Sequence, residues 1–158
     1  LFSYVMNNYW DTNYRAAQGG DFVFRYVMTS SADLDPAGLT RLGWESMRPA
    51  ELDYVMDQDK VGNPPRPLPA EGAGFLEIDQ PGIVLVDWKV AEDGRGTILR
   101  LQEIAGKSTQ VSVKFTRAAR QSATLCNAVE DDLKPVDLAG NTLRLDFQPH
   151  AVLTVRVQ

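Results

Sequence analysis

The chain has 158 residues, about the length of one domain, and its 44% hydrophobic and 23% charged residues are typical of a globular protein. The formal net charge of −5 argues against a broad basic face for nucleic acid, and no stretch approaches the 18 apolar residues that indicate a membrane span. A single cysteine, Cys126, and a single histidine, His150, exclude an internal disulfide and a structural zinc site with four nitrogen or sulfur ligands.

The N-terminal part predicts two strands separated by a long loop. Residues 1–6 are mostly apolar and predict a short strand, whereas residues 7–20 are rich in Asn, Gly and aromatic residues and predict an ordered loop. The side chains of residues 21–29 would alternate between the two faces of an extended chain, which predicts a strand. One face of it would carry Phe22, Phe24, Tyr26 and Met28, and the other Val23, Arg25 and Val27.

A short helix and a proline-rich crossing are expected next. Asp35 suits a helix N-cap and Pro36 the first helical position, so the helix begins there and ends near Arg48, before Pro49. Its apolar stripe would consist of Leu39, Leu42 and Met47. Residues 57–74 are rich in proline and predict a long extended surface loop.

From Phe75 onward the pattern is that of strands separated by turns. Residues 83–90 start with a continuous apolar run and predict a strand buried on both faces, and 92–96 predict a tight turn. Further strands are expected over 97–104, 110–116 (with Val111, Val113 and Phe115 inward), 123–129, 142–147 and 151–157. Seven to nine strands with frequent turns indicate an all-β fold, an antiparallel β-sandwich with one short helix, over a single domain of residues 1–158.

Nucleophilic catalysis would need His150 as its base. His150 follows Pro149 and enters the last strand, which we expect at a sheet edge, and no G-x-S-x-G elbow is present. A surface or structural histidine is the favoured interpretation, and we assign no catalytic residue.

Clustered carboxylates are the other chemical possibility, because glycoside hydrolysis needs two of them. The clusters are Asp33 with Asp35, Asp57 with Asp59, and the run 130–132. All lie in predicted loops or turns, so helix capping and solvated turns explain them better. Their spacing does not fit the twelve-residue calcium loop, and we assign no metal ligand.

The segment 7–15 combines amides, a hydroxyl, a cation and three aromatic rings in nine positions. Amides can both donate to and accept from sugar hydroxyls, and flat rings can cover a pyranose face. The candidate substrate-binding residues are therefore Asn8, Trp10, Thr12, Asn13 and Arg15. The alternative is a loop whose polar side chains bond its own backbone and whose rings pin it to the sandwich. Other rings that could stack on a sugar are Trp44, Tyr54 and Trp88, although Trp88 fits the core better.

This segment also carries a family resemblance. The stretch VMNNYWDTNYRAAQGGDFVFRYVMTS (Val5 to Ser30) resembles the Asn-x-Trp-x-Thr-Asn-aromatic stretch of the C-terminal region of glycoside hydrolase family 38, the α-mannosidases. Residues Ile98 to Val113 resemble its leucine-arginine-leucine strand with a following Glu and Gly turn. Residues Ala123 to Val157 resemble its closing segment, with an Asn-x-x-Glu turn and a Phe-x-Pro before the last strand.

The resemblance implies a division of labour. Members of the family cleave α-mannosides with retention, using an aspartate nucleophile, a carboxylic acid and a divalent zinc-type metal, all on an N-terminal α/β barrel. None of those motifs maps onto this chain, which begins without Met. We therefore expect the C-terminal β-sandwich fragment of a larger mannosidase-like enzyme, with no cofactor and no catalysis of its own.

Its expected partner is the catalytic barrel of the same protein, against which it would pack while the 7–15 loop reaches the substrate cleft. Two alternatives stay open: an independent module that binds mannose-containing carbohydrate, and a purely structural accessory domain. No nucleic acid or membrane partner is expected. The low cysteine count and the family habit predict a cytoplasmic location.

Overall fold

The computed structural model describes residues 2–6, 19–51, 72–117 and 119–158. By its contacts the chain divides into two compact units, Leu1–Asp33 and Leu34–Gln158. The strand, helix and core positions below refer to the described residues.

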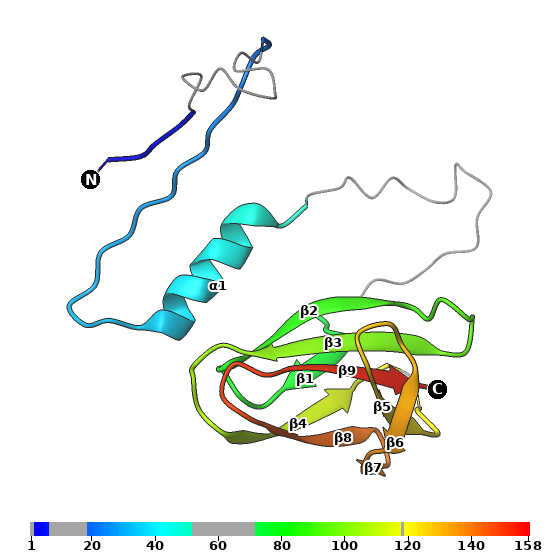
Figure 1. Cartoon of the computed structure of the whole chain (residues 1–158). Coiled ribbons are helices and arrows are strands. Elements are labelled where there is room, and N and C mark those ends of the chain that lie inside the picture. Colours follow the sequence, from blue (N-terminus) through cyan, green and yellow to red (C-terminus); the bar gives the residue numbers. More distant parts are fainter. Residues whose placement is uncertain (1, 7–18, 52–71, 118) are drawn as a thin grey trace, which may run out of the picture. The chain divides into compact units, whose positions relative to one another are not determined.

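The N-terminal unit has no regular secondary structure over its described residues, so the two predicted strands are wrong there. Residues 2–6 and 21–29 are exposed and join no sheet. The segment 21–29 runs as an extended trace (Figure 1) and keeps the pleated side-chain pattern, since the rings of Phe22 and Phe24 stack at 6.5 Å. Alternation specifies which side chains share a face, but a strand also needs a neighbour that pairs with its backbone.

The second unit begins with the only helix of the described residues, α1 (Pro36–Met47). Its predicted start is confirmed: the Asp35 side chain accepts a hydrogen bond from the Gly38 backbone N–H at 3.0 Å, and Pro36 follows the cap. The helix ends at Met47, and its C-cap Arg48 lies immediately before Pro49. No residue of α1 is buried, so the predicted apolar stripe does not form a core face.

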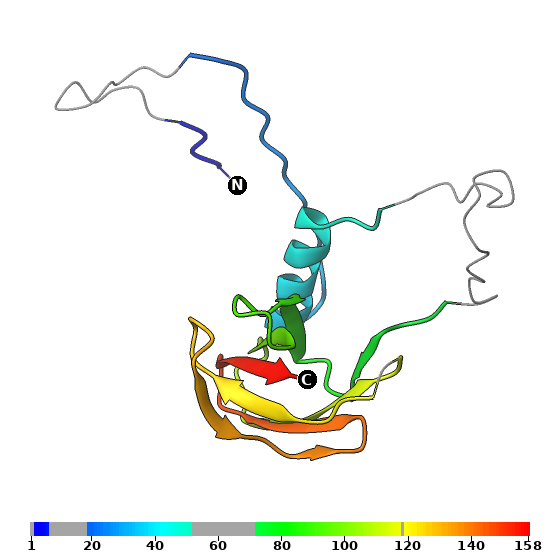
Figure 2. The same cartoon turned by 90° about the vertical axis from the view of Figure 1, so that its right-hand side faces the viewer.

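Nine strands follow in the part of the chain that the structure describes: β1 (Leu76–Ile78), β2 (Ile83–Val90), β3 (Thr97–Glu103), β4 (Thr109–Phe115), β5 (Ala123–Cys126), β6 (Asp132–Pro135), β7 (Leu138–Ala139), β8 (Thr142–Phe147) and β9 (Val152–Val157). They form a four-stranded sheet in the order β1-β4-β8-β7 and a five-stranded sheet in the order β2-β3-β9-β5-β6. Every pairing is antiparallel. The two sheets lie face to face (Figures 1 and 2), so the predicted antiparallel β-sandwich is confirmed.

Every second side chain of the inner strands points into the space between the two sheets and fills it. The four-stranded sheet contributes Val111, Val113 and Phe115 from β4, as predicted, and Leu143, Leu145 and Phe147 from β8. The five-stranded sheet contributes Leu99 and Leu101 from β3 and Val155 and Val157 from β9. Most of these side chains are less than 2% exposed. The period-2 pattern is thus realised on both inner faces.

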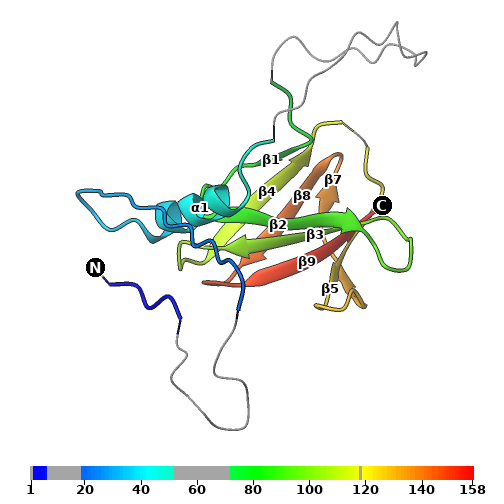
Figure 3. The same ribbon diagram turned by 90° about the horizontal axis from the view of Figure 1, so that it is seen from above.

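The positions of two strands differ from their predictions. β2 is an edge strand, and its ladder with β3 is interrupted between Leu85 and Asp87, so Leu85 and Val90 are exposed rather than buried on both faces. β9 pairs with β3 and β5 and is therefore internal, not at an edge (Figure 3). Strand order follows from long-range pairing, which the length of an apolar run does not reveal. Within the described residues, no helix is long and apolar enough to cross a membrane.

Candidate functional site

The predicted substrate residues Asn8, Trp10, Thr12, Asn13 and Arg15 lie outside the described residues, as do Tyr54, Asp57 and Asp59. Their predicted role therefore stays a prediction. The structure instead brings together charged groups of the sandwich that the sequence left scattered.

The first cluster is built around Glu103, at the end of β3, which is only 1% exposed. Its Oε1 accepts the backbone N–H of Ala105 at 2.7 Å. Its Oε2 accepts those of Gly106 at 2.9 Å and His150 at 2.8 Å. One carboxylate thus ties the β3–β4 turn to the β8–β9 turn.

Backbone donors keep this carboxylate ionised. Burial by itself raises the pKa of Glu103, but the hydrogen bonds from the backbone N–H groups of His150, Ala105 and Gly106 outweigh it and hold the pKa below its ordinary value. An ionised group with its lone pairs engaged in this way acts as a structural anion.

His150 belongs to the same cluster and serves the fold. Its backbone has φ of +59°, and its N–H donates to Glu103. Its ring lies against Gly106, where an added Cβ would sit 3.1 Å from Nε2. His150 itself is exposed, and the strand that follows it is internal rather than at an edge.

The second cluster surrounds Arg156 of β9, which is 3% exposed. Its guanidinium bonds Asp132 Oδ1 at 2.8 Å and Asp93 Oδ1 at 2.9 Å. It also donates to the backbone carbonyls of Arg95 at 2.9 Å and Glu130 at 2.8 Å. Arg156 therefore fastens the β2–β3 turn and the β5–β6 turn over the outer face of the five-stranded sheet.

Glu130 corrects the prediction of solvated carboxylates over 130–132, whereas Asp131 and Asp132 are exposed as predicted. Glu130 is 8% exposed, has φ of +71°, and pairs with Lys89 Nζ at 2.7 Å while accepting the Glu92 backbone N–H at 2.9 Å. Asn127 holds the same turn, because its Oδ1 accepts the backbone N–H groups of Val129 and Asp131 at 3.0 and 2.9 Å. Of the other clusters, Asp35 is the helix cap, as expected.

The charges of the Arg156 cluster stabilise one another. The Arg95 backbone N–H, the Arg95 side chain and Arg156 lower the pKa of Asp93 to about 2. The hydrogen bond to Arg156 likewise lowers the pKa of Asp132, and the same bond raises the pKa of Arg156. Each carboxylate is thus held as an anion and is not poised to carry a proton near neutral pH.

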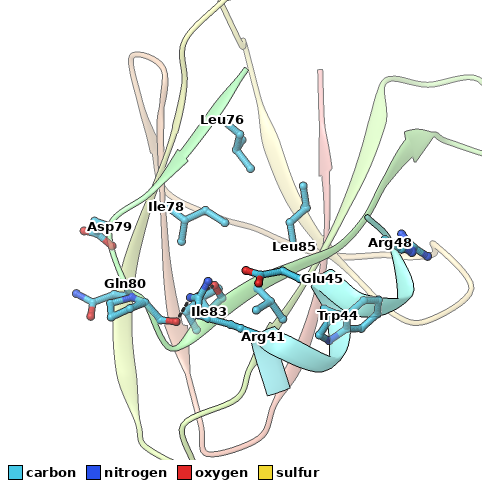
Figure 4. Close-up of a pocket in the computed structure, with 12 residues that line it drawn as sticks. Arg41, Trp44, Glu45, Arg48, Leu76, Ile78, Asp79, Gln80, Ile83 and Leu85 are labelled. Carbon is cyan, nitrogen blue, oxygen red and sulfur yellow. Dashed lines mark hydrogen bonds between the residues drawn. The ribbon is translucent and has the colours of Figure 1, made fainter. Parts of the chain in front are cut away.

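A groove of about 740 Å³ lies between α1 and the adjoining edges of the two sheets (Figure 4). One helix face contributes Arg41, Trp44, Glu45 and Arg48. The floor is mainly apolar, with Leu76 and Ile78 of β1 and Ile83, Val84 and Leu85 of β2. The Arg41 guanidinium donates to the carbonyl of Pro81, in the turn between β1 and β2. The groove therefore has an apolar base and a charged rim.

The aromatic rings divide between this groove and the core. Trp44 lines the groove and lies under the Arg48 guanidinium, 5.4 Å from its ring centroid. Trp88 packs edge-on against Phe115 with centroids 6.2 Å apart, which confirms its assignment to the core.

The side chains of the two charged clusters hold turns and are not arranged to transform a substrate. Among the described residues, no three His, Cys, Asp or Glu side chains come close enough together to hold a metal ion. The sequence reasoning missed Glu103 and Arg156. Glu103 follows Leu99 and Leu101 at intervals of two residues, so the alternation of the strand already indicates that its carboxylate points inward. The burial of Arg156, in contrast, depends on turns that fold over it.

Comparison with curated proteins gives no match for this chain. Residues 82–155 match the family model described as the glycosyl hydrolases family 38 C-terminal beta sandwich domain. That stretch runs from the turn before β2 into β9 and includes Glu103, Asn127 and Glu130 of the two clusters. The match does not reach Val5–Ser30, so that part of the resemblance stays a prediction. Over residues 82–155, the sandwich is therefore a family 38 C-terminal β-sandwich domain.

Proposed function

We propose that this domain is the accessory C-terminal sandwich of an α-mannosidase-like, retaining glycoside hydrolase, and that it is not catalytic by itself. The family match over residues 82–155 carries the proposal. A C-terminal domain of this family implies a catalytic domain in the same protein, which would be the partner of the sandwich. The engagement of Glu103, Glu130 and Asp132 in holding turns supports a structural role for this unit.

The divalent, zinc-type metal expected of such an enzyme would belong to the catalytic domain. The residues of this chain do not fit it, because the sequence offers one histidine and one cysteine. A metal site of that kind draws on several nitrogen, sulfur or carboxylate ligands together.

The loop that contains Asn8, Trp10, Thr12, Asn13 and Arg15 is proposed to contribute to the substrate cleft of the complete enzyme. Its mixture of amides and aromatic rings supports that role. A cytoplasmic location stays a prediction.

The division of labour is tested by comparing purified residues 1–158 with the complete gene product on an aryl α-mannoside. We expect turnover only by the complete protein. Turnover by the 158-residue chain, or none by the complete protein, would refute the proposal.

The loop's role is tested in the complete enzyme with Trp10→Ala, and Phe75→Ala serves as the control at an exposed aromatic ring outside the loop and outside the groove. A raised KM in Trp10→Ala, with an unchanged melting temperature, supports a cleft contact. A lowered melting temperature with an unchanged KM indicates a purely structural ring. An independent binding module would instead show NMR shifts at Trp10 and Tyr14 when residues 1–158 are titrated with mannose oligosaccharides.

A further inference from the structure

Strand β6 forms one edge of the five-stranded sheet (Figure 1), and its residues are poorly suited to pairing on the free side. An edge strand presents backbone donors and acceptors there, which can pair with a strand of another molecule. The other edge strands of the described residues limit such pairing in simple ways: β1 and β7 are only three and two residues long, and the ladder of β2 is interrupted. β6 combines a proline, a bulge and an inward lysine.

The proline, Pro135, removes a donor from the free side of the strand. The N–H of Val136 donates to the carbonyl of Ala123 in β5 at 3.0 Å, so the backbone N–H at position 136 faces the sheet. Because the backbone groups of successive strand residues point alternately to its two sides, position 135 faces away from β5. An incoming strand would therefore find no N–H donor at Pro135.

The bulge displaces Leu133 from the ladder between β5 and β6. Asp132 pairs with Cys126 of β5. The preceding residue of β5, Leu125, pairs with Lys134, so one step on β5 corresponds to two steps on β6. Leu133 is therefore the extra residue, and it is 60% exposed. Because a bulge bends and twists its strand locally, a regular strand cannot follow the free side of β6 over its length.

The lysine, Lys134, places a charge on the inner face of the sheet at this edge. It pairs with Leu125, which packs against the core, so the two side chains share a face. Both line a cleft of about 310 Å³ whose apolar walls also include Val136, Leu145 and Leu153. Other charged residues that line the cleft are Asp137, Arg144 and Asp146.

The position of Lys134 makes an added strand costly. Its aliphatic stem can cover the leucines of the cleft while its ammonium group stays in water. A strand added beside β6 would place its own side chains next to Lys134 on the inner face and withdraw the ammonium group from water. Such a withdrawal is unfavourable unless the new strand also supplies a paired carboxylate.

We propose that Lys134 and Pro135 prevent strand addition at β6, specifically the pairing of β6 with the β6 of a second copy of this chain. Every copy presents the same edge, so a twofold pairing of these edges would join two five-stranded sheets into one. The missing donor, the bulge and the inward charge each act against that pairing. The inference goes beyond the proposed function and does not depend on it.

The test restores an edge that can pair, in purified residues 1–158. The double variant Lys134→Val with Pro135→Val removes the charge and returns the missing donor, and both positions are exposed, so the fold should be retained. The new amide at position 135 faces the free side of β6, so it exchanges freely unless a second strand pairs with it. We expect its exchange, followed by NMR, to slow about tenfold or more as the concentration of the chain is raised. An amide that exchanges freely at every concentration would overturn the proposal.

Two matched controls separate the edge from a general loss of solubility. Lys134→Glu with Pro135→Val returns the same amide but keeps a charge on the inner face, and that amide should stay unprotected. Lys114→Val makes the same loss of charge on β4, which is paired on both sides, and sedimentation should show no added association. Equal protection in the two double variants, or equal association of Lys114→Val and the Lys134→Val double variant, would contradict the role assigned to Lys134.

Discussion

The strongest single test of the fold is Glu103→Gln, which keeps the shape of the side chain and removes its charge. The carboxylate accepts three backbone N–H groups, one on Oε1 and two on Oε2. In glutamine one of these positions becomes an NH₂ group, which cannot accept. The best placement keeps the carbonyl toward Gly106 and His150 and leaves the Ala105 N–H facing another donor.

The size of the effect follows from this geometry. Two charge-assisted bonds become neutral ones, a loss of about 1 kcal/mol each, and one buried N–H loses its partner, which costs about 1–3 kcal/mol. We therefore expect the unfolding free energy to fall by roughly 4 kcal/mol. Urea titration of the 158-residue chain, followed by circular dichroism and by the fluorescence of core Trp88, measures it.

Glu77→Gln is the matched control, because it is the same change at an exposed ion pair, with Lys114 at 3.1 Å. Such an exposed pair contributes less than about 1 kcal/mol to the unfolding free energy. If Glu103→Gln were no more destabilising than Glu77→Gln, the role assigned to the buried carboxylate would be refuted.

The pH dependence of the unfolding free energy provides a second test of the role of Glu103. The folded pKa of Glu103 lies below its ordinary value of 4.5, so its ionised form contributes stability above that pH. The contribution is lost as the pH falls through the folded pKa, where the protonated acid resembles glutamine. The gap in unfolding free energy between wild type and Glu103→Gln should therefore be constant at neutral pH and close at acid pH. A gap independent of pH would contradict the charge assignment.

Two further predictions concern the turns over the five-stranded sheet. Arg156→Met should lower the unfolding free energy by about 3 kcal/mol, the lower end for breaking a buried pair, because the side chains of Asp93 and Asp132 are 39% exposed. Arg144→Met, at an exposed position of β8, is its control, and equal urea midpoints for the two would contradict it. Gly94→Ala and Gly96→Ala both force alanine into positive φ, at a cost of about 1 kcal/mol, but only at Gly96 would the new Cβ meet a backbone oxygen, Val157 O, at 2.4 Å. Thermal unfolding should therefore show a distinctly larger loss of stability for Gly96→Ala. Equal losses of stability would show that the C-terminal end of β9 moves aside without cost.

The part of the sequence that matches the family includes several residues that hold turns. Glu103 anchors the β3–β4 turn, Asn127 shapes the β5–β6 turn, and Arg100 donates to the Ala128 carbonyl in that same turn at 3.0 Å. All three lie in segments whose sequence resembles the family and within the matched residues. The matched stretch therefore includes residues that fix turns of the sandwich.

Local signals in the sequence were enough for several elements of the second unit. Alternation placed Val111, Val113 and Phe115 inward, and Asp35 with Pro36 set the start of α1. These predictions succeeded because side-chain period and capping chemistry act within a few residues. The alternation that places Glu103 on the same face as Leu99 and Leu101 is a local signal of the same kind.

Tertiary structure alone decided the rest. β2 lies at an edge and β9 inside its sheet because of pairings between distant segments. Arg156 is buried because two turns, distant in sequence, close over it, and segment 21–29 alternates like a strand yet joins no sheet within the described residues. The amino-acid pattern fixes which side chains share a face, since that is a property of one segment. Whether a face is covered depends on a second segment, and only the assembled fold brings that segment into place.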